Sequence, residues 1–193
     1  MTLIDAINEM IGWIGESPID STDPDYTDHP LYASALRILN TTSEAVQSRG
    51  WWFNTYKGTL TPVADAIALG ASVLTVNVLN TSIDYTIRDG ALFDLTNNTA
   101  TIEDELTAMI RTLVTFDELP GTAATYITAL ASERFVKTYD GDRAKVADVK
   151  DDVEKAYIPF HADHIRNSKV NLYHTQSMGP ILANSWYGRY RLR

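Results

Sequence analysis

The spacing of apolar residues changes twice along this chain, and that change limits the folds it can adopt. From residue 3 to 49 apolar side chains recur every three or four positions, as on one face of a helix. From 51 to 118 they follow the alternation and turn signals of strands, and after 122 the helical spacing returns. Helices that flank a block of strands predict an α+β fold.

The helical spacing predicts a four-helix bundle-like part made of helices over residues 3–14, 30–49, 122–139 and 142–158. Thr2 and Asp5 are available as a capping pair at the start of the first helix. The last helix contains Pro159, which lacks a backbone N–H and should kink or end it.

The middle of the chain, residues 51–118, is predicted to form an antiparallel β insert. Val73 to Leu79 alternates between apolar and polar side chains. Asp89-Gly90 separates two apolar runs and predicts a hairpin, because glycine accepts the positive φ of a tight turn. Ala108 to Phe116 should form the last long strand, and the aromatic run at Trp51 has strand preference.

Charge separates the body of the chain from its end. The first 163 residues carry 11 Lys and Arg against 25 Asp and Glu, a net charge of −14, whereas residues 164–193 hold five cations and no acid. An acidic body repels phosphates, which argues against a protein that grips DNA. We expect a single domain over residues 1–168 and an extended C-terminal arm over 169–193.

The sequence lacks cysteine, so disulfides, thiolate nucleophiles and the common zinc-finger patterns are excluded. No apolar run approaches the ~18 residues of a membrane span, and Met1 to Asp5 has no basic flank before an apolar run. We expect a soluble protein that no signal peptide directs to secretion and that does not enter a membrane.

The arm carries the side chains that binding hot spots favour, aromatic residues and arginine. The alternative is that the arm is a disordered basic terminus. Contact with a partner is slightly favoured, and the partner would need an acidic or apolar surface to offset the cost of ordering the arm. The acidic body of a neighbouring copy is one candidate for that surface. The predicted contact residues are Trp186, Tyr187, Arg189, Tyr190, Arg191 and Arg193.

Chemistry-bearing motifs are scarce. The chain has no phosphate-binding glycine loop, no G-x-S-x-G and no H-E-x-x-H, so no catalytic residue, cofactor or metal site is predicted. His161 and His164 would share a helix face, but two ligands do not make a site. The acids Glu103-Asp104-Glu105 and Asp117-Glu118 fit solvated turns better than a pair held across a sugar.

The run Trp51-Trp52-Phe53 could stack on a sugar or a base. Three aromatic residues directly after a helix more often anchor that helix on a sheet, and no basic groove or partner acid accompanies them. Arg49 sits at the negative end of the preceding helix, and Gly50 suits a left-handed helix end. We predict that residues Arg49 to Phe53 pack the junction between helices and sheet or an interface between copies.

Several segments of the chain carry a family resemblance. The most specific is Val46-Gln47-Ser48-Arg49-Gly50-Trp51-Trp52-Phe53-Asn54, which follows Arg37-Ile38-Leu39-Asn40. The others are the turn Ile14-Gly15-Glu16-Ser17-Pro18-Ile19 after the first helix, Phe116-Asp117-Glu118-Leu119-Pro120 and Ala129-Leu130-Ala131-Ser132-Glu133-Arg134-Phe135. Together they resemble the tail tubular protein A family, the head-to-tail adaptors of short-tailed, podovirus-type phages. The resemblance covers roughly residues 3–160, and the family pattern cannot be aligned beyond about Asn167.

The resemblance implies a structural protein of the virion tail, assembled in the host cytoplasm, and not an enzyme. Such adaptors form a ring, typically of twelve copies, between the portal protein and a tail nozzle of the tubular protein B type. Genomic DNA passes through the ring on ejection without specific binding, and a tail fibre is a further candidate partner. The family's C-terminal region contacts the portal.

Two other functions stay open on the sequence alone. One is a tail-associated polysaccharide hydrolase that uses acids such as Asp117 or Glu118. The other is a head-completion connector of a different family, which would do the same work with a different fold.

Overall fold

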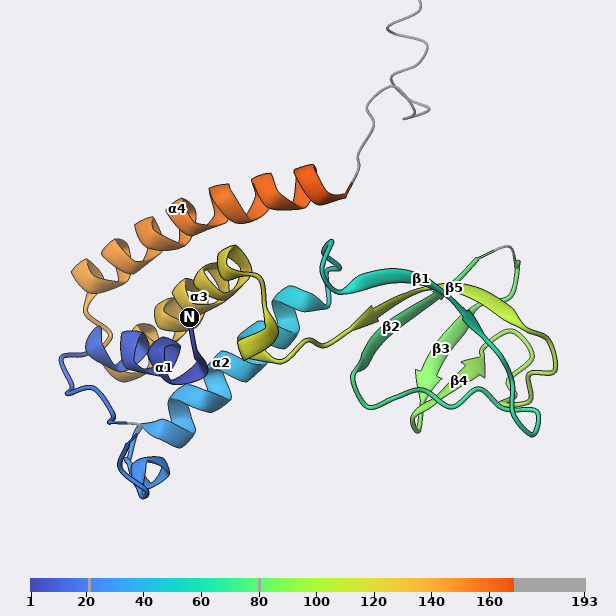
Figure 1. The fold of residues 1–193 in the computed structure, drawn as a ribbon, viewed down its shortest axis with the longest axis horizontal. Coiled ribbons are helices and arrows are strands. Elements are labelled where there is room, and N and C mark those ends of the chain that lie inside the picture. The colour runs from blue at the N-terminus through green and yellow to red at the C-terminus, as the bar shows by residue number, and fades with distance from the viewer. Residues whose placement is uncertain (21, 80, 169–193) are drawn as a thin grey trace, which may run out of the picture.

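The structure, a computed structural model, describes residues 1–20, 22–79 and 81–168. It has a helical part and a β part joined by a narrow neck that the chain crosses twice, once after α2 and once before α3 (Figure 1). Helices and antiparallel strands are segregated in this way in α+β proteins, so the predicted fold class is confirmed. The predicted arm, residues 169–193, lies outside the described residues.

The helical part consists of α1 (Leu3–Gly12), α2 (Tyr32–Gln47), α3 (Gly121–Tyr139) and α4 (Arg143–Asn167), with short 3-10 helices η1 (Tyr26–Asp28) and η2 (Phe116–Glu118). α3 is the central helix: it packs against α1, α2 and α4, and its buried residues include small ones that let the neighbours approach closely. The predicted capping box is present, because Thr2 Oγ1 accepts from the Asp5 amide and Asp5 Oδ2 accepts from the Thr2 amide.

The prediction that Pro159 ends or kinks the last helix near residue 158 is wrong as to its end, because α4 continues to Asn167. Pro159 is exposed, so the carbonyl left without its usual N–H donor can be hydrated. A proline inside a helix costs about 3 kcal/mol. Burial of Phe160 in the next position, and the hydrogen bond from Thr122 Oγ1 to Asp163 Oδ2 (2.9 Å), hold the last two turns against α3 and the neck.

The other helix boundaries shift by one or two residues from the prediction. The first helix ends at Gly12, and the second spans Tyr32–Gln47 instead of 30–49. The third begins at Gly121. Such shifts reflect capping geometry, which the spacing of apolar residues does not report.

The β part contains β1 (Thr55–Leu60), β2 (Val73–Val78), β3 (Tyr85–Arg88), β4 (Ala91–Asp94) and β5 (Leu106–Thr112). β5 is the centre of an antiparallel sheet in the order β1-β5-β2, and β3 and β4 form a hairpin. Asp89 and Gly90 both have positive φ, so the hairpin predicted from this pair is confirmed. A small core of its own, centred on Ile67, Leu92 and Ile102, lies under these strands.

Two predictions within the insert are wrong. Trp51 to Phe53 form a turn and not a strand, and β1 begins only at Thr55. The last strand spans Leu106–Thr112, not 108–116, and Phe116 lies in η2 and packs in the helical core. Both errors fall at the neck, where the chain leaves one core for the other.

None of the helices in the described ranges is long and apolar enough to cross a lipid bilayer.

We predict that replacing Phe160 destabilises the whole helical part. Its ring is fully buried among Trp51, Trp52 and Tyr126, so Phe160→Ala should lower the free energy of unfolding by about 3–5 kcal/mol. Ile158 lies on the same helix and is 70% exposed, so Ile158→Ala should change it by less than about 0.5 kcal/mol. Urea unfolding followed by tryptophan fluorescence measures both, and equal losses would contradict the packing described for α4.

Candidate interaction site at the junction

The neck is held by a buried side-chain amide at the end of α2. Gln47 is fully buried, and its Oε1 accepts a hydrogen bond from the Val114 amide (2.8 Å) while its Nε2 donates to the Val114 carbonyl (2.9 Å). The side chain thus pairs with the backbone N–H and C=O of a residue 67 positions away, as a residue of a neighbouring strand would. Because Gln47 is buried, removing its side chain would leave the Val114 amide and carbonyl without a hydrogen-bond partner, since water cannot reach them.

Asn54 makes a second set of bonds directly beside the first. Its Oδ1 accepts from the Trp51 amide (2.8 Å), and its Nδ2 donates to the carbonyls of Gln47 (2.9 Å) and Thr112 (3.1 Å). The Asn54 carbonyl also accepts from the Thr112 amide (3.0 Å). Two buried amide side chains therefore tie the end of α2 to both crossings of the neck.

Gly50 turns the chain out of α2 with a φ of +82°, the left-handed conformation that favours glycine. Arg111 fills the space above it and donates from Nη1 to the Ser48 carbonyl (3.0 Å), a free acceptor at the end of the helix. A Cβ atom at position 50 would lie 2.3 Å from Arg111 Nε. Arg49 is exposed, and its charge partly offsets the rise in the pKa of Tyr126 that burial causes.

The predicted aromatic run lies against the far end of α4. Trp51 is buried, donates from Nε1 to the Val46 carbonyl (2.7 Å), and has its ring 4.2 Å from that of Phe160. Trp52 is half-buried and meets Phe53 edge to face at 5.1 Å. His164 approaches Trp51 at 5.1 Å, and burial lowers the pKa of its imidazole, with nearby His161 adding to the effect.

An open groove of about 350 Å³ runs along this junction between the last turn of α4 and the sheet. The half-buried Trp52 and Arg111 line it together with Met109 of β5. Asn167 and Ser168, the last described residues of the chain, form its other rim. The groove offers aromatic, thioether and guanidinium surface, which suits packing against another protein.

The structure brings Gly50, Trp51, Trp52 and Phe53 together at the neck and leaves Arg49 exposed beside them. Sequence reasoning did not single out Gln47, Asn54 or Phe160. The first two lie within the segment that carries the family resemblance, which is the signal that could have found them. The six predicted arm residues, Trp186, Tyr187, Arg189, Tyr190, Arg191 and Arg193, lie outside the described residues.

Two of the acids considered for sugar hydrolysis, Asp117 and Glu118, accept structural hydrogen bonds. Asp117 Oδ1 accepts from the Leu3 amide (2.8 Å) at the start of α1, and Glu118 Oε2 accepts from Thr115 Oγ1 (2.8 Å). Glu103 to Glu105 border an open groove of about 580 Å³ on the β part. Asp94 in that groove has a pKa lowered by hydrogen bonds from Asn97, the opposite of what a general acid needs.

The two histidines of α4 also have local partners. His161 stacks on Tyr157 with ring centres 5.3 Å apart, and His164 Nδ1 lies 3.1 Å from Ser168 Oγ. Within the described part of the chain, His, Asp and Glu side chains form no group of three or more placed to hold a metal ion.

We predict that Gly50→Ala destabilises the protein more than Gly15→Ala. Both glycines have positive φ, +82° and +86°, so both changes cost about 1–2 kcal/mol of backbone strain. A Cβ at Gly15 meets nothing within 4 Å, whereas one at Gly50 displaces Arg111 from Ser48 and should cost roughly 1–2 kcal/mol more. Denaturant unfolding measures the difference.

The Arg111→Ala background supplies the control for this prediction. Without the guanidinium the two glycine substitutions should cost the same, since only the strain remains. A persisting excess at Gly50 would show that the Arg111 contact is not its cause.

Comparison with known proteins agrees with this architecture. A family model described as tail tubular protein matches residues 4–169, which include both parts and the whole neck. The chain is also similar to tail tubular protein A of Klebsiella phage KP34, with 25% identity over 172 residues, 89% of this chain and 91% of that protein. The resemblance found in the sequence is thereby confirmed, and a connector of a different family is no longer an alternative. The chain belongs to the tail tubular protein family, the structural proteins of phage tails.

Proposed function

We propose that this protein is the adaptor of a short phage tail, forming a ring between the portal and the tail nozzle through which DNA leaves the capsid. The family match over residues 4–169 carries the proposal. Twelve copies form the ring in the host cytoplasm and remain in the virion tail.

The two-part shape supports an adaptor, because each part has its own core and can present its own surface. The helical core is built from α1 to α4, and the smaller core around Leu92 lies at the far end of the neck (Figure 1). An adaptor must bind different proteins at its two ends, and separate cores let each end specialise. The buried amides of the neck support treating residues 1–168 as a single domain, since they couple the two parts.

The charge distribution supports a channel that lets DNA slide. Residues 1–163 have a net charge of −14, and like charges suppress binding to the phosphate backbone. A wall of this kind conducts DNA without holding it. The basic, aromatic arm has a different role, which is to contact the portal or a neighbouring copy.

No described feature favours the hydrolase alternative, because Asp117 accepts from the Leu3 amide at the start of α1 and Glu118 accepts from Thr115 Oγ1. Incubating the protein with envelope polysaccharide, beside an Asp117→Asn variant, tests that alternative. Turnover lost on substitution would favour the enzyme over the adaptor.

Assembly with the portal protein of the same phage tests the adaptor directly. We expect native mass spectrometry and electron microscopy to show a ring of about twelve copies that docks coaxially on the portal, because cyclic assemblies close when one interface repeats. The free protein can stay monomeric until the portal brings copies together. A chain that remains monomeric and ignores the portal at high concentration would contradict the proposal.

We also predict that deleting residues 186–193 leaves folding intact and weakens portal docking. The deleted segment contains Trp186, Tyr187 and Tyr190 with three arginines, residue types that dominate binding energies. The melting temperature should move little, while the portal affinity should fall by roughly tenfold or more. A large loss of thermal stability instead would mean that the segment belongs to the core.

A further inference from the structure

The outward face of α4 carries exposed apolar side chains. Residues Val149, Ala156 and Phe160 face α3, and at about 100° per residue Ile158 and Ile165 fall on the opposite side of the helix. Ile158 is 70% exposed and Ile165 is 53% exposed. They lie two turns apart, about 10 Å along the axis, and form a ridge that stays exposed among the residues the structure describes.

A shallow apolar groove lies on the other side of the helical part. It has a volume of about 340 Å³ and lies where the start of α1 meets η1 and α2. Its walls are the half-buried Leu3, Ile4, Tyr26 and Tyr32 together with the polar Thr2 and Asp117, and the two tyrosine rings meet edge to face at 5.4 Å. Branched aliphatic side chains such as those of the α4 ridge suit a groove of this composition.

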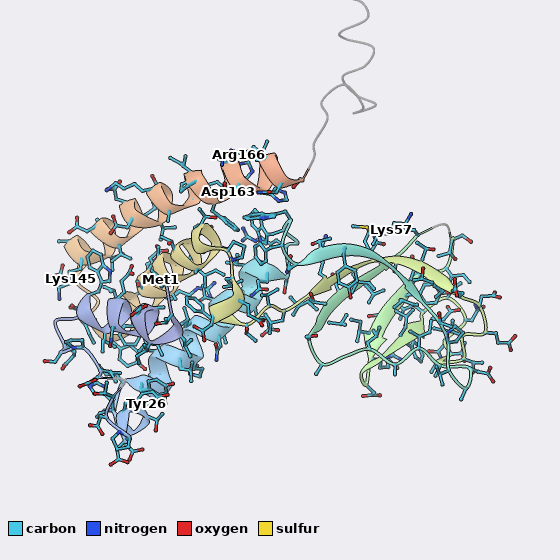
Figure 2. The ribbon with its side chains drawn as sticks, viewed as in Figure 1. Met1, Tyr26, Lys57, Lys145, Asp163 and Arg166 are labelled. Carbon is cyan, nitrogen blue, oxygen red and sulfur yellow. The ribbon has the colours of Figure 1, made fainter. Side chains whose placement is uncertain are left out.

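The ridge and the groove point in different directions. α3 lies between α4 and the pair α1 and α2, and Figure 1 shows α4 at one edge of the helical part and η1 at the other. Figure 2 places Tyr26 on the side opposite to Asp163 and Arg166. A closed ring needs such an arrangement, because each copy must offer one patch to the copy before it and an unlike patch to the copy after it.

Resting on the ring proposed above, we propose that the α4 ridge of one copy, Ile158 and Ile165, packs into the Leu3–Ile4–Tyr26–Tyr32 groove of the next copy. The occupant of the groove is thus a second copy of this chain.

Charges around the two patches favour the same pairing. The groove is bordered by Asp117 and by the segment 22–28, which contains Asp23, Asp25 and Asp28 and no Lys or Arg. The end of α4 bears Arg166, which is exposed and bound to Asp163 at 2.7 Å, and no acid follows Asp163 in the sequence. Asp163 offsets the charge of Arg166, so the described end of α4 is neutral overall, and the exposed Arg166 guanidinium is the group that can meet the acidic rim and set the register.

The absence of cysteine from the chain allows a direct test of this interface. Ile158→Cys and Tyr26→Cys are prepared as separate proteins with different tags, mixed, assembled on the portal and treated with a short bismaleimide. We expect cross-linked pairs in the mixture and few in either protein alone, because the interface joins unlike patches. Tyr56→Cys, on the 50% exposed Tyr56 of β1, replaces Tyr26→Cys as the control and should give few cross-links to Ile158→Cys.

The Ile158→Glu variant provides an independent test of the proposed interface. Its circular dichroism and melting temperature should match those of the unaltered protein, since the side chain is exposed, while ring formation should weaken by roughly tenfold or more.

Three results would overturn the proposed interface while leaving the adaptor intact. The first is normal ring formation by Ile158→Glu. The second is cross-linking by Ile158→Cys alone, which would mean that α4 pairs with α4, and the third is cross-linking of Ile158→Cys to the portal or to the arm. If the unaltered protein forms no ring with the portal, the adaptor itself fails, and this interface fails with it.

Discussion

The pairing of the Gln47 side chain with the backbone of Val114 is the contact on which the rest of the structure depends. In the described part of the chain, the neck is crossed at the end of α2 and at the return from β5, and Gln47 joins these two crossings by two hydrogen bonds. Asn54 repeats the arrangement one step closer to the sheet. Because both amides are buried, their bonds cannot be exchanged for water without a desolvation cost, and the β part is held in one orientation to the helices.

The same junction explains the length of α4. A helix that stopped near Pro159 would leave the rings of Trp51 and Trp52 exposed at the neck. Burial of Phe160 against them, followed by His164, favours two further turns in spite of the missing backbone hydrogen bond. The helix consequently ends beside the junction groove, where Asn167 and Ser168, the last described residues, form one rim.

The sequence was sufficient to predict those features that depend on residues close to one another in the chain. The capping box at Thr2 and the hairpin at Asp89-Gly90 depend on residues within four positions of one another, and both were predicted. Gln47 and Arg111 reach partners more than 60 residues away, and no property of a polar residue in a helix or strand indicates such a partner. Strand propensity alone predicted a strand at the aromatic run beginning with Trp51. The run forms a turn instead, because Asn54 accepts from the Trp51 amide and α4 packs on the Trp51 ring.

One copy can fold alone and also take part in the proposed ring, because the apolar surface of its core is separate from the apolar surface of the proposed interface. The large core, with Ile7, Leu39 and Phe135 fully buried, is closed within one copy. The ridge on α4 and the groove beside η1 are small by comparison, and a contact of that size is weak when made once. In the proposed assembly, repetition around a closed ring on a portal would raise the effective concentration at every contact. Weak single contacts would then keep free copies apart and still give a stable ring once the portal has gathered them.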